Sequence, residues 1–582
     1  MDQQALQFGE ALEAALGDPA QANSAINFHA SLELDEQETF PQAHLDCLRE
    51  LGCFEQLIPQ ALGGGLTELE RAMLMSRLIS RRDLTTAIAF GQTMLGSIPV
   101  WLAGNPEQQR QAADLLRQGS LACLALTEKE HGSDILSTEF RVRQQDAVLL
   151  ASGSKWLINN GRRGASLTVL CRVERADGGS ALGLLWLRRP QGTDGAAVAP
   201  SWRSHPKIRT LGIRGADISG FQLHDHPCDA DALICGPEAT LFTVLKTLQI
   251  SRVLCAGFSL GAIDTMFRLT FRFAHGRRLY GKLAADIPMV KAKLARSYAG
   301  ILVADLVAQI ACRAIAANPA ELSLLSAVAK CHVPGQCEEI ARQLALALGA
   351  RHYVRSEYPW GVFQKLMRDS QVVSLFDGST QVNLSLVATQ LRALGAGLRR
   401  KLEGGLGTDH LEKVRPLLWR DESSKGWPAQ SQLCLSANGE DSLLAAFFEM
   451  RAVQRGVSLP PALEHALAAL ETRLRLWLAA CHAALDQESL GQDTVRVMQL
   501  AGQYVGLHAA ACAALAWHLH RGALPGYRLD DAVLLEYLDG ALPQACIVVT
   551  DAQRQALVDA AAALIEQQRL ISLLDVRISD GP

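Results

Sequence analysis

Residues 139–161, EFRVRQQDAVLLASGSKWLINNG, alternate apolar and polar positions with a period close to two, and Asp, Gly and Asn interrupt the run. Alternation of this kind is typical of short β-strands. Further runs of the same character follow, namely SLTVLCRVE, ALGLLWLRR and DISGFQLHD. The region from residue 123 to residue 235 is therefore predicted to be a β domain.

The regions on both sides of this β domain have the longer period of helices. Examples are HLDCLRELGCFEQLIPQALGGG before it and PMVKAKLARSYAGILVADLVAQIACRAIAA after it. A helical block, a β block and a second helical block indicate an α+β protein that is mainly α. We expect an N-terminal helical domain over 1–122, the middle β domain over 123–235 and a helical domain over 236–400.

The last third of the chain adds a further region to this plan. Gly, Pro and Ser crowd residues 403–432, which is typical of a linker. Beyond them apolar residues return with a period near 3.6, so one buried helical face is expected. Its members are Leu463, Leu467, Leu470, Leu474, Trp477 and Cys481. Residues 401–582 are therefore predicted to form a linker and an additional C-terminal helical domain.

The bulk composition excludes several classes of protein. With 49% hydrophobic and 20% charged residues over 582 positions, the chain is typical of a multidomain globular protein rather than a disordered or fibrous one. The net charge of -4 creates no global field that would attract nucleic acid. No Cys-x-x-Cys pair occurs among the 14 cysteines, so we expect no metal site and the reduced thiols of a cytoplasmic protein.

Neither end of the chain indicates export or a membrane anchor. The first residues, MDQQALQFGEALEAALGD, carry acids early and lack the apolar core of a signal peptide. Near the other end, the longest apolar run, 507–519, is too short to cross a bilayer and contains His508 and His518. We therefore expect no integral membrane segment.

An acidic residue in the stretch 374–382, SLFDGSTQV, allows two interpretations. Asp377 precedes Gly378, and Asp-Gly is among the commonest turn dipeptides, so Asp377 could serve only as part of a tight turn. A carboxylate in this place could also act as a general base. The residues alone leave both interpretations open.

Separated motifs in this chain, taken in order, resemble those of the acyl-CoA dehydrogenase family. The segments are LALTEKEHGSDILSTEFRV at 124–142, GSKWLINNG at 153–161, GRRLYGKLAADIPMVKAKLA at 276–295 and QKLMRDSQVVSLFDGSTQVNLSLVATQL at 364–391. They are similar to the family's Thr-Glu…Gly-Ser-Asp, Gly-x-Lys-x-Trp, Arg-x-x-Phe-Gly and Arg-Asp…Glu-Gly-Thr segments. The resemblance covers roughly residues 40–395. It implies two helical domains and a β domain, with FAD in the cleft between them.

The resemblance also assigns residues to FAD. Leu126 and Thr127 match the strand end at the reactive edge of the flavin, and Arg277 matches an arginine that reaches a pyrophosphate across the subunit interface. Leu157 stands where the family has a tryptophan, because the tryptophan of this chain is Trp156. The residues expected at FAD are Leu126, Thr127, Gly132, Ser133, Leu157, Asn159, Arg277, Tyr280, Ser379 and Gln381.

The resemblance places the base that removes the α proton at Asp377, where the family usually has glutamate. Some members carry the base on a neighbouring helix just before an arginine, and this chain has Ser251 before Arg252 there. Serine cannot serve as the base, which leaves Asp377 as the only carboxylate at either position. Aspartate has about 1.5 Å less reach than glutamate. Ser251, Arg252 and Phe376 are expected to contact the substrate.

These assignments predict FAD-dependent α,β-dehydrogenation of an acyl thioester, either acyl-CoA or an acyl-carrier-protein thioester, to the trans-2-enoyl thioester. Electron-transfer flavoprotein or oxygen would accept the electrons. A flavin oxidase or oxygenase on the same scaffold is the alternative, because nitroalkane oxidases resemble this family and use aspartate. A catalytically idle flavin-binding scaffold is the second alternative.

Longer members of the family also carry an additional helical domain. In this chain residues 401–582 contain 15 Lys+Arg and 22 Asp+Glu, a balance unsuited to a phosphate backbone. We expect this domain to be structural and to cover surface that smaller family members bury in tetramers. The expected assembly is a homodimer that binds no nucleic acid.

Overall fold

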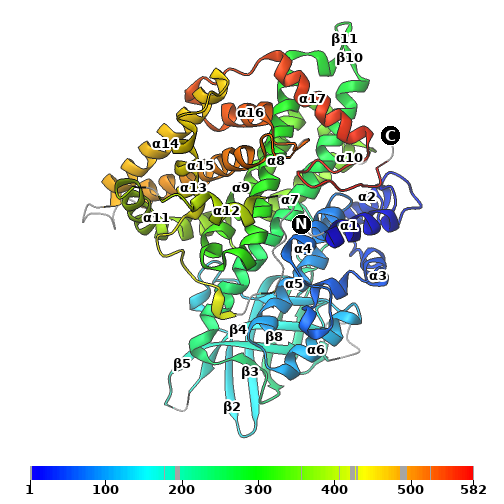
Figure 1. Cartoon of the computed structure of the whole chain (residues 1–582). Coiled ribbons are helices and arrows are strands. Elements are labelled where there is room, and N and C mark those ends of the chain that lie inside the picture. Colours follow the sequence, from blue (N-terminus) through cyan, green and yellow to red (C-terminus); the bar gives the residue numbers. More distant parts are fainter. Residues whose placement is uncertain are drawn as a thin grey trace.

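The structure, a computed structural model, describes residues 3–175, 177–190, 197–355, 357–405, 407–419, 427, 430–485, 494–524 and 526–580. Figure 1 shows a β-sheet at one end of the molecule and helices over the rest. The main sheet is formed by residues that lie between two helical regions of the chain. The α+β, mainly α fold class is therefore confirmed, while the exact domain boundaries stay predictions.

Six α-helices build the described part of the N-terminal region. They are α1 (Gln3–Leu16), α2 (Phe28–Glu36), α3 (Gln42–Glu50), α4 (Leu69–Ser80), α5 (Leu84–Ala103) and α6 (Pro106–Arg117). Side-chain caps fix three of the helix starts, because Asn27 accepts the N–H of Ala30 in α2, Asp83 that of Thr86 in α5 and Asn105 that of Gln108 in α6. Nearly every residue of α5 is buried, so this helix forms an inner wall of the region.

Nine strands of the middle region form one sheet. They are β1 (Ala122–Ala125), β2 (Arg141–Gln145), β3 (Val148–Asn159), β4 (Ser166–Glu174), β5 (Ser180–Arg188), β6 (Ala197–Ala199), β7 (Trp202–His205), β8 (Ile218–Cys228) and β9 (Leu233–Cys235). The order across the sheet is β6-β7-β8-β3-β2-β4-β5-β9, and β1 pairs with β4 in parallel. The pairs β2–β3 and β3–β8 are antiparallel.

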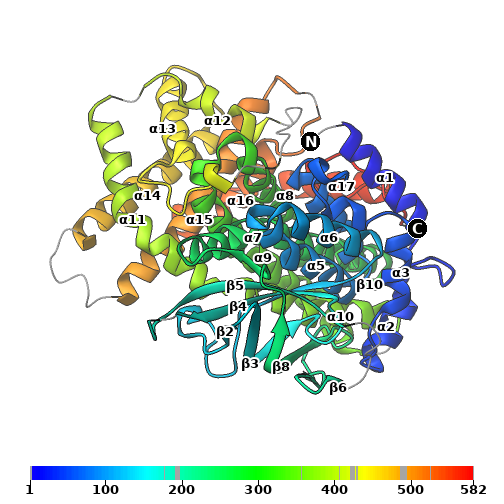
Figure 2. The same ribbon diagram turned by 90° about the horizontal axis from the view of Figure 1, so that it is seen from below.

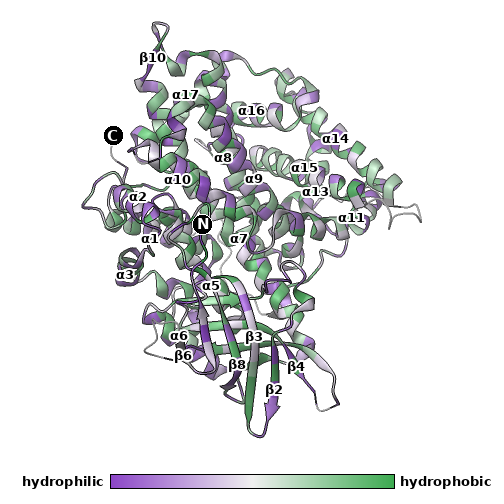
Figure 3. Ribbon diagram, turned by 180° about the vertical axis from the view of Figure 1, so that it is seen from behind, coloured by the Kyte–Doolittle hydropathy of each residue, from purple (hydrophilic) through white to green (hydrophobic). Residues whose placement is uncertain are grey.

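The sheet has a small hydrophobic core of its own. Phe140, Leu167, Trp202 and Phe221 belong to it, and the rings of Trp202 and Phe221 stack with centroids 5.7 Å apart. Figure 3 shows both hydrophobic and hydrophilic residues on β2 and β3, and burial alternates along much of β3, where Leu149, Ala151 and Lys155 are buried and Val148 and Ser154 are exposed. The alternation that predicted strands therefore buries one face of the sheet and leaves the other to solvent.

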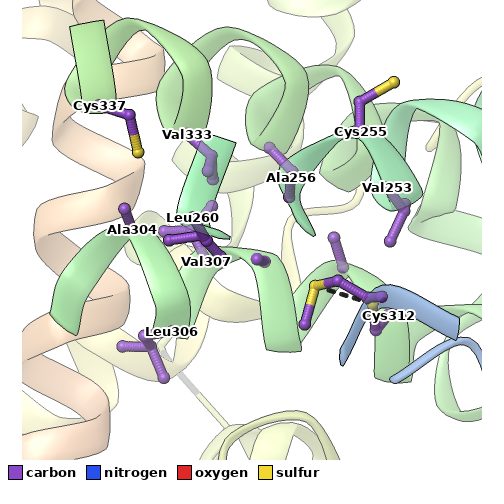
Figure 4. Close-up of a cluster of buried hydrophobic side chains, with 14 of the residues drawn as sticks. Val253, Cys255, Ala256, Leu260, Ala304, Leu306, Val307, Cys312, Val333 and Cys337 are labelled. Carbon is purple, nitrogen blue, oxygen red and sulfur yellow. Dashed lines mark hydrogen bonds between the residues drawn. The ribbon is translucent and has the colours of Figure 1, made fainter. Parts of the chain in front are cut away.

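Three long helices cross the centre of the molecule, namely α7 (Pro237–Gly276), α8 (Pro288–Ala317) and α9 (Leu322–Leu348). Figure 4 shows Leu260, Val307 and Val333 close together where these helices meet, and all three side chains are buried. A hairpin of β10 (Arg278–Leu279) and β11 (Lys282–Leu283) joins α7 to α8. The helices α10 (Trp360–Ser370) and α11 (Thr380–Glu403) complete this region.

By length and composition, the helices α5, α7 and α8 are each apolar enough to cross a membrane. Their most apolar windows are 83%, 78% and 94% buried inside the fold, respectively. Packing against other helices therefore accounts for their composition. The expectation of no membrane segment rested on the run at 507–519 and overlooked these three helices.

Six helices of the C-terminal region pack beside the central ones. They are α12 (His410–Leu418), α13 (Ser442–Gln454), α14 (Pro461–Leu485), α15 (Thr494–His520), α16 (Asp531–Ala541) and α17 (Asp551–Glu566). Figures 1 and 2 show α13, α14 and α15 together on one side of the central helices. The predicted apolar face of α14 is buried throughout, which confirms the helical period seen in the sequence.

After α17 the chain returns as a tail across helices that are distant in the sequence. Arg77 on α4 donates to the carbonyl oxygen of Ile571 at 2.6 Å. Glu13 on α1 accepts the backbone N–H of Ser579 at 3.0 Å. The first and last described parts of the chain are thus joined through buried polar contacts.

Candidate active site

The turn that carries Asp377 lies between the 3-10 helix η7 (Gln371–Ser374) and α11. Asp377 and Gly378 both have positive φ angles, 55° and 88°, so the backbone passes through the left-handed region. For aspartate this conformation costs about 1 kcal/mol or more and needs support from its surroundings. The turn interpretation of Asp377 is confirmed, and it leaves the carboxyl available for chemistry.

Two buried cations support this turn. The Lys330 ammonium on α9 donates to the carbonyl oxygen of Phe376 at 2.7 Å, and Arg252 Nε on α7 lies 3.4 Å from the carbonyl oxygen of Asp377. A Cβ atom at Gly378 would lie 3.2 Å from Arg252 Nη2. Glycine therefore suits this position through both its φ angle and this close approach.

Two protein groups form hydrogen bonds with the Asp377 carboxyl. The Cys255 thiol on α7 donates to Oδ2 at 3.5 Å, and the Gln92 side chain on α5 makes a second hydrogen bond. Burial raises the pKa of this carboxyl above its ordinary value, and the Lys330 ammonium opposes the rise only in part. A raised pKa makes a carboxylate a stronger base, so this environment suits proton abstraction.

A mostly apolar pocket opens beside this carboxyl, and among the described residues that line it Asp377 is the only one with a carboxyl group. Helices α4, α5 and α7 supply most of its wall. Its larger apolar side chains are Leu57, Phe90, Met94, Leu95, Leu254 and Phe258. An apolar chain bound here would hold a carbon atom beside a base with few water molecules nearby.

The three residues expected to contact substrate all lie at this pocket or at the turn. Ser251 lines the pocket. Arg252 is buried at the turn, where burial lowers its pKa to about 10. The ring of Phe376 packs on Phe258 with centroids 6.2 Å apart. The structure therefore brings Ser251, Arg252 and Phe376 together around Asp377.

A second group of predicted residues gathers on the sheet. The backbone N–H of Trp156 donates to the carbonyl oxygen of Thr127 at 3.1 Å, which joins the segment after β1 to β3. Leu157 sits at a register shift between Trp156 and Ile158, has a φ of 59° and is 43% exposed. Asn159 is the last residue of β3. A leucine at positive φ is strained, and such residues cluster at functional sites.

A buried ion pair, which the sequence analysis left without a role, supports this group. Lys155 Nζ donates to Glu128 Oε1 at 2.8 Å and to the carbonyl oxygen of Leu126 at 3.0 Å. Burial lowers the pKa of Lys155. Burial alone would raise the pKa of Glu128, but the hydrogen bond from Lys155 helps to hold it below the ordinary value. The available signal was a lysine at an inward position of an otherwise apolar strand.

The donors beside Leu157 suit a ligand that is rich in acceptors. The backbone N–H groups of Leu126, Thr127, Gly132 and Ser133 donate to no other residue in the described part of the chain. A Cβ atom at Gly132 would meet nothing within 4 Å, so the backbone is open to a ligand there. Flavin carbonyl oxygens and a pyrophosphate are such acceptors, and the residues present therefore fit FAD.

The remaining residues assigned to the cofactor lie elsewhere. Arg277 follows the end of α7 and Tyr280 belongs to the next turn, at the opposite end of the molecule from the sheet (Figure 1). Tyr280 is 96% exposed. Ser379 caps α11, and Gln381 is exposed in the first turn of that helix. Within one chain the structure does not bring Arg277 and Tyr280 to Leu157, an arrangement that fits a role across a subunit interface.

Three residues beside Asp377 were not predicted from the sequence, namely Gln92, Cys255 and Lys330. Each stands in a long and otherwise apolar helix, so a polar residue with a buried partner was the available signal. Cys255 also falls one helical turn after Ser251, on the same face of α7.

Comparisons with known proteins agree with this arrangement. Residues 22–119 match the family described as acyl-CoA dehydrogenase, N-terminal domain, and residues 242–392 match acyl-CoA dehydrogenase, C-terminal domain. FadE25 of Mycobacterium tuberculosis, a probable acyl-CoA dehydrogenase, is 23% identical over 373 residues, which cover 64% of this chain and 92% of that protein.

Solved structures share the fold. An acyl-CoA dehydrogenase from Bacillus anthracis, complexed with FAD, has a TM-score of 0.72 at 17% identity and covers 97% of this chain and 95% of its own. This similarity extends over the C-terminal helices. The prolyl acyl carrier protein oxidase AnaB has a TM-score of 0.58 at 16% identity and covers 67% of this chain and 99% of its own. The chain therefore carries the N-terminal and C-terminal domains of the acyl-CoA dehydrogenase family and is an FAD-dependent oxidoreductase of that type.

Proposed function

We propose that the protein catalyses the FAD-dependent α,β-dehydrogenation of an acyl thioester and that Asp377 removes the α proton. The observation that carries this proposal is a carboxyl with a raised pKa in the wall of an apolar pocket. Membership of the family supports acyl-CoA dehydrogenation in general. The assignment of the base rests on the pocket.

The pocket would orient the acyl chain with its α carbon at Asp377. Negative charge develops on the thioester carbonyl oxygen as the proton leaves. The backbone N–H of Asp377 donates to no residue in the described part of the chain, so it is available to that oxygen. A fixed donor of this kind strengthens as the charge grows and thereby lowers the barrier.

The N–H groups of Leu126, Thr127 and Ser133 would hold FAD beside Leu157. FAD supplies the acceptor for a hydride from the β carbon. The substrate thus gives its α proton to Asp377, loses two electrons with the β hydride and leaves as the trans-2-enoyl thioester. Asp377 must be ionised to act, so its raised pKa sets the lower pH limit of the reaction.

Both acyl-CoA and an acyl-carrier-protein thioester are candidate substrates, because the pocket contacts the acyl chain rather than its carrier. Electron-transfer flavoprotein and oxygen are the two candidate acceptors of the electrons. An oxidase or oxygenase is the second candidate function, since aspartate replaces the usual glutamate at 377 and AnaB, a structural relative, is an oxidase. A flavin-binding scaffold without activity is the third.

We also propose a homodimer. Arg277 and Tyr280 are exposed and distant from Leu157, so a second chain is needed to bring them to the same FAD. Helices α16 and α17 cover α8, where Arg296 Nε lies 3.1 Å from Glu536 Oε1. They occupy a surface that a larger assembly would otherwise use. All 14 cysteines are free thiols, which supports a cytoplasmic location.

Anaerobic titration of the purified holoenzyme with a panel of acyl-CoA and acyl-carrier-protein thioesters tests the proposal. Loss of the oxidised flavin absorbance with a specific thioester, and formation of the enoyl product, are the expected results. Release of peroxide at a comparable rate in air would instead identify an oxidase. A flavin that no thioester reduces, in a protein with intact FAD, would leave only the idle scaffold.

A further inference from the structure

Lys330 lies on α9, directly beneath the turn that carries Asp377, and is buried. Its ammonium donates to the carbonyl oxygens of Val373 and Phe376 and lies 3.4 Å from that of Gly378. An ammonium has three donors, so the three carbonyl oxygens use its full capacity. It also stands 5.2 Å from the centre of the Phe376 ring. Within the part of the chain that the structure describes, the hydrogen bonds of this ammonium thus all go to the segment 373–378.

These contacts determine which way the peptide groups of the turn face. In a trans peptide the C=O and the N–H that share one plane point in opposite directions. The C=O of Phe376 points at Lys330, so the N–H of Asp377 points away from it. Arg252 holds the next C=O, that of Asp377, and Asn383 Nδ2 donates to the one after it at 2.8 Å. Three successive carbonyl groups are therefore fixed by side chains from α7, α9 and α11.

We propose that Lys330 is a positioning residue for the base, because it holds the turn at 376–378 so that the carboxyl and the N–H of Asp377 both face the acyl pocket. This inference rests on the proposed function of Asp377 and extends it to a residue that touches neither substrate nor FAD. Without Lys330 the left-handed conformation of Asp377 would lose its principal support, and the base would leave its place by an ångström or more. Displacement of about 1 Å typically costs about 100-fold in rate.

Lys330 also contributes charge at this place. The titratable or charged groups that interact with the Asp377 carboxyl are Arg252 and Cys255 on α7 and Lys330 on α9. Lys330 also faces Cys331 and Glu338 of its own helix. Helix α5 presents only the uncharged Gln92. Among the groups that favour the ionised carboxyl, Lys330 has the largest effect on its pKa. Loss of this ammonium should therefore raise the pKa of Asp377 further.

The variants Lys330→Gln and Lys330→Arg separate these roles from simple support of the fold. In Lys330→Gln we expect FAD to remain bound, the rate of flavin reduction at neutral pH to fall at least about 10-fold, and the rising limb of the pH profile to move up by about one unit. Lys330→Arg keeps the charge but not the compact set of three donors. The Lys330→Arg variant should therefore reduce the flavin more slowly, while the rising limb of its pH profile stays at the wild-type pH.

A titration without substrate makes this test independent of the reaction. The infrared carbonyl band of the protonated Asp377 carboxyl can be identified in the holoenzyme as the band that Asp377→Asn removes. Its midpoint should move to higher pH in Lys330→Gln. If no thioester reduces the wild-type flavin but this midpoint moves, the proposed reaction is wrong, while the contact by which Lys330 controls the ionisation of Asp377 is retained.

Lys365→Gln is the matched control. Lys365 is also a buried lysine, but its ammonium pairs with Asp83 at 2.7 Å and Asp369 at 2.6 Å, away from the pocket. The Lys365→Gln variant should lower the melting temperature. It should not move the pH midpoint of flavin reduction or that of the infrared titration. An unchanged rate and midpoint in Lys330→Gln would overturn the proposal. If that variant does not fold, a moved midpoint in Lys330→Arg, which retains the charge, would overturn it instead.

Discussion

Carboxylates in two regions of the molecule have opposite kinds of neighbours. Where the C-terminal tail crosses α1, α4 and α8, buried carboxylates meet arginines directly: Asp305 Oδ1 lies 2.8 Å from Arg77 Nη1, and Glu13 Oε2 lies 3.1 Å from Arg81 Nη1. At the pocket, the Asp377 carboxyl meets no cation within 4 Å in the described part of the chain. Its neighbours are a thiol and an amide.

The pKa values follow this difference. Burial alone would raise the pKa of Glu13 and of Asp264, but the adjacent guanidinium groups hold both below the ordinary value. Burial raises the pKa of Asp377, and its weaker partners do not reverse the rise. Charges in direct pairs fix the structure, whereas a carboxyl with weak partners can take up a proton. The difference distinguishes the carboxyl available for chemistry from those that stabilise the fold.

The largest effect on the reaction rate is expected when Asp377 can no longer accept a proton. Asp377→Asn keeps the size of the side chain and the turn but removes the base. Stopped-flow flavin reduction by the true substrate should fall about 10²–10⁴-fold, because a positioned base typically contributes that much. The wild-type rate should rise with pH as the carboxyl ionises, and Asn should abolish this limb.

Asp377→Glu sharpens the same test. If the pocket is built around the shorter side chain, the extra methylene of Glu places the carboxyl past the α carbon and also lowers the rate. Recovery of a higher rate than the wild type would show instead that Asp377 is a weakened form of the family's base. An unaltered rate in Asp377→Asn would prove that Asp377 is only a turn residue.

Substitutions in the buried ion pairs beside the C-terminal tail should lower the stability of the fold rather than the rate of the reaction. The Asp305 carboxylate faces Arg77 and accepts the backbone N–H of Leu573 at 2.8 Å. Asp305→Asn removes its charge. Breaking a buried pair from one side typically costs about 3–5 kcal/mol. Chemical denaturation should report a loss of this size, with the reduction rate per bound FAD unchanged. The exposed pair Asp409–Lys413, 2.7 Å apart, is the control, and its loss in Asp409→Asn should leave the free energy of unfolding almost unchanged because solvent screens the pair.

Sequence reasoning was most reliable where local patterns decide the structure. The period-two stretch at 139–161 became β2 and β3, and the period-3.6 face of α14 is buried. These two features depend on neighbours in the sequence, which a single chain displays. The choice of Asp377 came instead from the resemblance to the family, and the residue does line the pocket, while its role as the base stays a prediction.

Contacts between distant segments were not accessible in this way. Lys330 and Gln92 reach Asp377 from helices far away in the sequence, and no local pattern marks either partner. The tail at 569–580 carried no signal of its pairing with α1 and α4. Leu157 could be aligned, but its strained φ follows from a register shift in β3 that alternation alone does not reveal. Predictions of this kind need the packing of the whole molecule.

A smaller effect should come from narrowing the pocket without touching its charge. A Cβ atom at Gly91 would lie 2.5 Å from Phe258 Cζ, so Gly91→Ala should push this ring into the pocket. We expect kcat/KM for the longest accepted acyl chain to fall about 10-fold, since one methylene is worth that much in an apolar pocket. Gly502→Ala is the control, because a Cβ there meets nothing within 4 Å. Equal values of kcat/KM in the two variants would show that Phe258 does not limit the length of the acyl chain.

The smallest expected effect is a gain in stability of the Asp377→Asn variant. It tests whether Asp377, unlike the paired carboxylates, contributes nothing to the stability of the fold. In the folded protein the pKa of Asp377 is raised, so its carboxyl ionises at higher pH than in the unfolded chain. Between the unfolded and the folded pKa, the unfolded state binds fewer protons, and wild-type stability falls as pH rises. Asp377→Asn lacks this ionisation. Its gain in the free energy of unfolding over the wild type should therefore be absent in acid, grow between the unfolded and folded pKa of Asp377, and level off above the folded pKa. At neutral pH the gain should be about 0.5–2 kcal/mol, as is common when a functional constraint is relieved. Urea denaturation across this pH range measures it. A variant that is less stable than the wild type at every pH would mean that the Asp377 carboxylate is a structural charge like Asp305, and the distinction between the two regions would fail.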